Sequence, residues 1–268
     1  MVVGLAALPR LISLDFGFQS ATPCPDRSDH APPVTRTDLP ALDHFQFQGA
    51  SGYLDDFVAQ IDAPQLDRIE IRYLNQLVDF QVTQLYKFIN RSAGPKLTLF
   101  RYAQFTFYGN AVSFKTSRHA NDSYAPPARI TVICQGIDWQ VWHIAEVLSQ
   151  FSVTLSHVVH LKLKNYFDHC QLKGIDEIEW MDLFRHFSPV KTLYVDWLFA
   201  GPIALALEGI AVEMIAEVLP SLDLIYLAGQ RASSIEGFIA ARQLSGCSVT
   251  VVDTRTEFDE RLKSYTTE

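Results

Sequence analysis

The sequence predicts an α/β protein whose parallel strands come from one repeated phrase. The phrase has nine residues, with apolar side chains at positions one, four, seven and nine, as in FSPVKTLYV at 187–195 and LPSLDLIYL at 219–227. Its second half alternates between apolar and other side chains, which is typical of a strand with one buried face. A unit that recurs at intervals of roughly 20 to 50 residues is typical of a repeat architecture, and most copies here recur at about this interval.

Seven copies of this phrase occur along the chain. They span residues 8–16, 39–47, 63–71, 99–107, 155–163, 187–195 and 219–227. A degenerate copy with Ile130, Val132 and Cys134 falls in the widest interval, and a weak last strand, SVTVVD, follows at 248–253. We expect a leucine-rich-repeat-like solenoid, that is, a curved and mainly parallel sheet with helices on its convex face. The alternative is a compact doubly wound domain.

Apolar residues at helical spacing lie between the copies. The stretches are 51–61, 137–151, 176–187 and 233–246. The first begins at Ser51, a residue type that caps helices well, and the last stops at Gly246. In the second and third stretches the side chains expected in the core are Trp142, Ala145, Leu148, Phe151, Ile178, Met181 and Phe184.

The apolar stretch 198–219 predicts a further buried helix. It contains Glu208, Glu213 and Glu217. Carboxylates are costly in hydrocarbon, so these residues argue against a membrane span and we expect no membrane partner.

We expect one irregular repeat domain over residues 1–268 that opens directly with a strand within 5–18. Proline-containing segments with few apolar residues predict loop excursions at 19–38 and 117–129. Gly109 and Asn110 lie between two alternating runs and predict a β-hairpin.

The composition argues against several kinds of chemistry. The formal net charge is −8, whereas nucleic-acid binding needs clustered cations. Glycine-rich phosphate loops and nucleophile elbows do not occur, so we expect no enzyme and no cofactor. The only cluster of metal-binding residue types is His157, His160, His169 and Cys170, which we interpret as ordinary surface residues rather than a zinc site.

Two groups of residues, three carboxylates and four cysteines, are explained without catalysis or secretion. The carboxylates of Asp176, Glu177 and Glu179 are explained by the positive end of a helix dipole. The four cysteines are far apart along the chain: Cys24, Cys134, Cys170 and Cys247. Such spacing is typical of reduced thiols and predicts an intracellular protein, cytoplasmic or nuclear.

The candidate partner-binding residues follow from the alternation within the phrase. Positions six, eight and ten point away from the core and line the concave face of a solenoid. The candidates are Arg68, Glu70, Arg72, Gln104, Tyr108, His160, Lys162, Lys164, Tyr194, Asp196 and Tyr226. Tyr and Arg often carry interface energy, so we expect this face to bind an acidic or mixed-charge protein segment. The alternative is a sheet face that is merely solvated.

Short sequence motifs in the chain indicate a family. The diagnostic motifs are LPAL at 39–42, IDAPQL at 61–66, VKTLYV at 190–195 and EVLPSL at 217–222. Their surroundings, at 32–77, 179–229 and 237–246, resemble the repeat region of F-box-like proteins that are numerous in mushroom-forming fungi.

The resemblance implies a role in ubiquitin ligation. In such families an amino-terminal F-box docks on the adaptor of a cullin-type ligase, and the repeats hold the substrate. This chain departs from the pattern, because no three-helix F-box precedes its first strand phrase. It is either a fragment or a family member that has lost docking, so we expect adaptor binding only if an F-box exists upstream.

The expected function is therefore protein–protein recognition, as the substrate-binding repeat region of an F-box-type ubiquitin ligase receptor. The alternative is a structural or vestigial repeat protein without ligase docking or a dedicated ligand. The identity of the partner does not follow from these residues.

Overall fold

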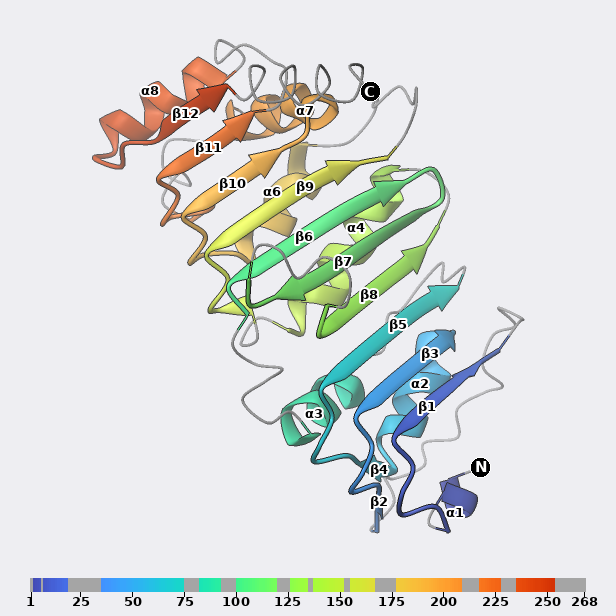
Figure 1. Ribbon diagram of the computed structural model, residues 1–268. Helices are drawn as coiled ribbons and strands as arrows, with labels where there is room; N and C mark the ends of the chain where they lie inside the picture. Colours follow the sequence, from blue (N-terminus) through green and yellow to red (C-terminus); the bar gives the residue numbers. More distant parts are fainter. Residues whose placement is uncertain are drawn as a thin grey trace, which may run out of the picture.

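The computed structural model describes most of the chain in several stretches. These are residues 2–5, 7–18, 35–74, 82–92, 100–119, 126–134, 137–151, 155–166, 177–208, 217–227 and 235–253. They form one large, mostly parallel sheet, with helices packed behind it (Figure 1). The chain thus has the α/β class that the sequence predicts.

Ten strands make this sheet within the described residues. In spatial order they are β1 (Ser13–Gly17), β3 (His44–Gly49), β5 (Arg68–Leu74), β8 (Ala128–Ile133), β7 (Ala111–Ser117), β6 (Tyr102–Tyr108), β9 (His160–Asn165), β10 (Thr192–Val195), β11 (Leu224–Leu227) and β12 (Thr250–Asp253). A separate parallel pair joins β2 (Thr37–Asp38) to β4 (Ile61–Asp62).

The helices connect successive strands. They are α1 (Val2–Leu5), α2 (Ser51–Val58), α3 (Thr83–Ser92), α4 (Ile137–Ser149), α6 (Glu177–Arg185), α7 (Trp197–Glu208) and α8 (Glu236–Leu244). Figure 1 shows α2, α3, α4, α6 and α7 behind the sheet, on one side of it. A doubly wound arrangement needs helices on both faces, so that alternative does not describe this part of the chain.

The repeated phrase has a structural explanation. In every copy except 99–107, the amide N–H of the fourth residue donates to the carbonyl of the first over 3.0 or 3.1 Å. This tight turn directs positions one and four into the core just before the strand begins, and both are buried in the five copies that start at residues 39, 63, 155, 187 and 219. The phrase is therefore a turn and a strand that share one buried face.

Backbone hydrogen bonds also join each unit to the next at the phrase's fifth position. The carbonyl of Lys191 accepts from the amides of Asp223 and Leu224 at 2.9 and 3.0 Å. The carbonyl of Asp43 accepts from Asp67 and Arg68 at the same two distances. Neighbouring copies are thereby held in one register, and their seventh positions, Leu161, Leu193 and Ile225, lie side by side in a single parallel sheet.

The strand order departs from the chain order in the middle of the sheet. β8 pairs with β5 and β6 pairs with β9, both in parallel, while β7 lies between β8 and β6 and is antiparallel to both. We call β6, β7 and β8 the meander. The connections through α2, α3, α4, α6 and α7 all step the same way across the sheet with the helix on the same side, as uniform crossover handedness requires. The meander steps in the opposite direction. The predicted Gly109–Asn110 hairpin, which joins β6 to β7, is confirmed.

The copy at 99–107 was aligned wrongly by two residues. Its Ala103 and Phe105 pair with Leu161 and Leu163, the seventh and ninth positions of the next copy in the sheet. Tyr102, assigned to the core as position four, instead lies beside His160 on the opposite face. The first residue of this copy, Leu99, lies outside the described residues.

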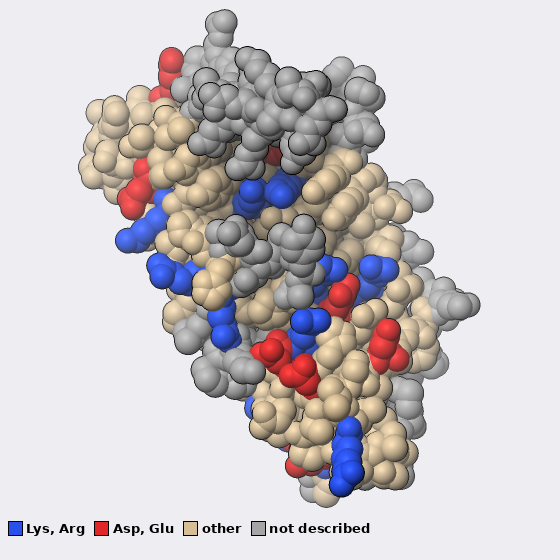
Figure 2. All heavy atoms as spheres, in the orientation of Figure 1, with Lys and Arg blue, Asp and Glu red and all other residues tan. Residues whose placement is uncertain are grey.

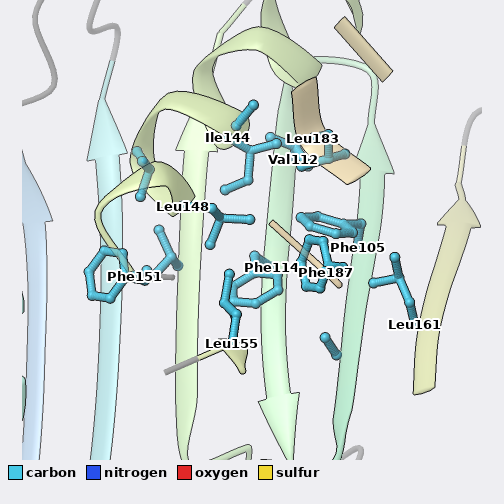
Figure 3. Close-up of a cluster of buried hydrophobic side chains, with 14 of the residues drawn as sticks. Phe105, Val112, Phe114, Ile144, Leu148, Phe151, Leu155, Leu161, Leu183 and Phe187 are labelled. Atoms are coloured by element: carbon cyan, nitrogen blue, oxygen red, sulfur yellow. The ribbon is translucent and has the colours of Figure 1, made fainter. Parts of the chain in front are cut away.

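The core lies between the sheet and the helices. Under the meander, the ring of Phe105 lies 5.0 Å from that of Phe114 and 5.7 Å from that of Phe187. Figure 3 shows these three rings together, with Ile144 and Leu148 of α4 beside them. All five side chains are buried, so the inserted strands share the core of the repeats.

Several local predictions were wrong at element boundaries. The expected first strand within 5–18 is only Ser13–Gly17, and it follows the short helix α1. Ser51 is the first residue of α2 rather than its cap; Ala50 occupies the cap position without a side-chain hydrogen bond. The last helix does end as predicted, since Gly246 has a φ of +77° just beyond α8.

Two large side chains predicted to be buried are exposed. Trp142 is 43% exposed and Ile178 is 63% exposed. In α6, Phe184 is buried as predicted, and Trp180 and Leu183 are buried beside it. Both helices carry apolar residues around most of their circumference, so the spacing alone did not select the buried side.

Other predictions fall partly on residues outside the described stretches. Of the two loop excursions, 19–34 and 120–125 lie outside them, whereas residues 37–38 form β2 and residues 128–129 begin β8. Of the helix expected at 198–219, α7 is described up to Glu208. Among the described helices, none has the length and apolar character needed to cross a membrane.

Candidate partner-binding face

The face of the sheet opposite the helices, here called the open face, carries the side chains that alternate with the core. Strand register aligns them into rows. The middle row crosses all ten strands as Asp15, Gln46, Glu70, Arg129, Lys115, Gln104, Lys162, Tyr194, Tyr226 and Val252. Figure 2 shows this face, with Lys and Arg side chains over its central part. A chain of net charge −8 therefore presents a locally basic surface.

An aromatic platform lies at the β10–β11 end of the middle row. The rings of Tyr194 and Tyr226 stack with centroids 4.6 Å apart and an interplanar angle of 3°. The Lys162 Nζ lies 5.8 Å from the centroid of the Tyr194 ring. Burial, and then the neighbouring Tyr226 and Tyr102, raise the pKa of Tyr194, so its hydroxyl remains a hydrogen-bond donor at neutral pH.

A second stack lies one row away, toward the amino-terminal ends of the strands. Tyr102 and His160 are parallel, with centroids 4.5 Å apart and an interplanar angle of 13°. Burial and the nearby Arg101 lower the pKa of His160, which favours the neutral ring at neutral pH. The two stacks extend the apolar part of the open face across β6, β9, β10 and β11.

A hollow of about 230 Å³ lies on the open face where β5 meets the meander. We call it the basic hollow. Its lining residues are Arg72, Tyr108, Ala111, Ser113, Lys115, Arg129, Thr131 and Ile133. The Arg129 Nη1 lies 3.3 Å from the Glu70 Oε1.

The structure brings many of the predicted site residues together. Lys162, Tyr194 and Tyr226 form the platform, while Arg72 and Tyr108 line the basic hollow. The remaining predicted residues that lie on this face are Arg68, Glu70, Gln104, His160 and Lys164.

Asp196 has a structural role instead. Its Oδ1 accepts from the amide of Leu198 at 3.4 Å, and its Oδ2 accepts from the amide of Asn165 at 3.5 Å. The carboxylate thus caps α7 and ties it to the end of β9, which explains its position without a partner.

The repeated phrase did not predict five residues of the open face, which are Tyr102, Ser113, Lys115, Arg129 and Thr131. Four of these lie on β7 and β8, whose strands are not regular copies of the phrase. The signal for them was the alternation within SFK at 113–115 and RIT at 129–131, where a polar residue stands on each side of an apolar one.

The metal-binding residue types in the described part of the chain are dispersed. No group of His, Cys, Asp and Glu there could hold a metal ion. His169, Cys170 and Cys24 lie outside these stretches. Cys134 is buried, and neither Cys134 nor Cys247 forms a disulfide within the described residues.

Comparisons of the chain with protein-family models, curated protein sequences and solved structures found no match. The geometry of the open face therefore carries the functional argument.

Proposed function

We propose that this chain is a protein–protein recognition module, built as a leucine-rich-repeat-like solenoid with the open face as its binding surface. The solenoid proposal is supported by the repeated turn-and-strand unit and its fixed hydrogen bonds to the next unit. On the resemblance to F-box-like proteins, we further propose that the bound segment is the substrate of a ubiquitin ligase.

The observation that carries the binding proposal is the Tyr194–Tyr226 platform. The two rings stack on one another with the Lys162 ammonium over the Tyr194 ring, so this part of the row offers ring edges and hydroxyl groups to a partner. Tyrosine anchors contribute large contact areas at little cost in side-chain entropy and are enriched among residues that dominate binding. A partner segment that covers the rings gains apolar burial while their hydroxyl groups stay available for hydrogen bonds.

One observation favours the alternative of a structural repeat protein without a ligand. Polar side chains on the open face partly satisfy each other, since Gln104 donates to Thr106 at 2.9 Å and Arg129 pairs with Glu70. A face that is merely solvated accounts for these internal pairs, and a cross-strand tyrosine pair also stabilises a sheet without a ligand.

The experiment is a selection of displayed peptides on the purified chain, followed by titration of the selected peptides. Tyr194→Ala and Tyr226→Ala should each weaken binding by more than about 1 kcal/mol, roughly fivefold. Trp139→Ala is the matched control, because Trp139 is a 49% exposed aromatic residue on helix α4. Unchanged affinity in both tyrosine variants, with folding intact, would place the site elsewhere. Failure of the wild type to select any peptide would favour the structural alternative.

A further inference from the structure

The basic hollow collects positive charge that the described protein does not neutralise. Arg72, Lys115 and Arg129 contribute three cations. Among the described residues, the only carboxylate in contact with them is Glu70, paired with Arg129. Within the described residues, neither Arg72 nor Lys115 has a carboxylate oxygen within 4.0 Å. Lys164 lies next to the hollow, since its register partner Thr106 pairs with the lining residue Ser113.

These cations disfavour each other. Burial, then Arg129 and then Lys164 lower the pKa of Lys115, and Glu70 only partly opposes them. A lysine held among other cations has no benefit for the fold itself, because like charges destabilise the folded state. An anion in the hollow would relieve this repulsion.

The floor of the hollow offers neutral donors. The Thr131 hydroxyl donates to the Ser113 Oγ at 3.2 Å, which leaves the Ser113 hydroxyl hydrogen directed elsewhere. Ser113 is only 4% exposed, although the strand register places it on the open face. Tyr108 lines the same hollow and is exposed. Charged forks around the hollow and hydroxyls within it are the donor set that tetrahedral oxyanions use.

We propose that the basic hollow binds the phosphate monoester of a phosphorylated serine or threonine in the partner segment. This inference rests on the proposed function and names the chemistry of its partner. Three cations less one carboxylate leave a charge of +2, which matches the charge of about −1.5 to −2 on a phosphate monoester. A glutamate or aspartate carries one negative charge and would leave one cation unpaired.

The sheet geometry also sets the spacing within such a partner. Lys115 on β7 and Tyr194 on β10 lie in the middle row, separated by three strand-to-strand steps. Steps of about 4.8 Å give roughly 14 Å, which an extended chain spans with about four residues. The expected partner therefore has an aromatic or large apolar residue about four positions from the phosphorylated residue.

The first arm of the test titrates the full chain with inorganic phosphate at constant ionic strength. Arg72→Gln and Lys115→Gln should each weaken phosphate binding by about tenfold. Lys87→Gln is the matched control, because Lys87 is an exposed cation on helix α3, which lies behind the sheet and away from the hollow. We expect it to bind phosphate like the wild type. Equal affinity in all four proteins, or no binding by the wild type, would overturn the proposal.

The second arm uses paired peptide libraries, phosphorylated and not, with an aromatic residue at varied spacing. The wild type should select phosphorylated peptides with a spacing of about four, and Tyr194→Ala should weaken peptide binding without affecting inorganic phosphate. Phosphate binding without selection of any phosphopeptide would overturn the assignment to a protein segment. Peptide binding that depends on Tyr194 but not on phosphorylation or Arg72 would overturn the inference and leave the proposed function standing.

Discussion

The ladder of β9, β10, β11 and β12 and the meander of β6, β7 and β8 use the same alternation in different ways. In the ladder, every strand is parallel to the next, and β9, β10 and β11 come from successive copies of the phrase. Neighbouring side chains on the open face there occupy the same phrase position, and the eighth position supplies Lys162, Tyr194 and Tyr226. A repeated position therefore becomes a row of similar contacts, which is how the aromatic platform arises.

In the meander, the side chains on the open face come from strands that are not successive copies. Lys115 and Arg129 are register partners across an antiparallel pair, and Glu70 is the register partner of Arg129 on β5. Residues that are far apart in the sequence thus form one charged cluster. Repetition of one phrase therefore gives the ladder a uniform surface. The reversed strand order of the meander instead brings charged residues from different strands together at one point.

The largest expected effect tests whether the meander is part of the common core. Phe105 is fully buried against the rings of Phe114 and Phe187. Phe105→Ala should lower the free energy of unfolding by about 3–5 kcal/mol, because it removes a ring and leaves a cavity. Chemical denaturation measures this value. A loss below about 1 kcal/mol would mean that the meander is a peripheral addition.

The matching change in the ladder is expected to be somewhat smaller. Leu193 is fully buried at the seventh position of its phrase. Leu193→Ala should cost about 2–5 kcal/mol, since a leucine side chain has less apolar volume than a phenylalanine ring. The same denaturation experiment applies, with Lys191→Ala at an exposed neighbouring position as the control. An effect as small as that of the control would show that the phrase register is wrong.

How far the sequence predicts this molecule depends on the region. The ladder was predicted in detail, because each copy contains its own turn and the register follows from it. The strand order of the meander was not predictable, since sequential strands are usually neighbours and nothing in the sequence marks where a crossover passes over two strands. Lys115 and Arg129 were missed for the same reason. Trp142 and Ile178 were misplaced because their helices are apolar on more than one side.

The smallest expected effect tests whether Lys115 destabilises the fold by charge repulsion or stabilises it by packing. Lys115 is half-buried, and burial with nearby cations lowers its pKa. Lys115→Met should raise the free energy of unfolding, by less than about 1 kcal/mol because solvent screens much of the repulsion. Thermal and chemical unfolding without phosphate measure the change, and Lys164→Met is a comparison at the edge of the cluster. A clear loss of stability would show that Lys115 supports the fold rather than a ligand.

The adjacency of β8 to β5 is the central claim, because it alone brings Arg72 next to Arg129 and Lys115. In this order the buried side chains of Ile71 and Ile130 are register partners. Ile130 and Leu161 are separated by three strand steps, about 14 Å. A nuclear Overhauser spectrum of a methyl-labelled sample tests this directly. We predict a strong cross-peak between the methyl groups of Ile130 and Ile71 and none between those of Ile130 and Leu161. The reverse pattern would place the strands in chain order and separate the cations of the basic hollow.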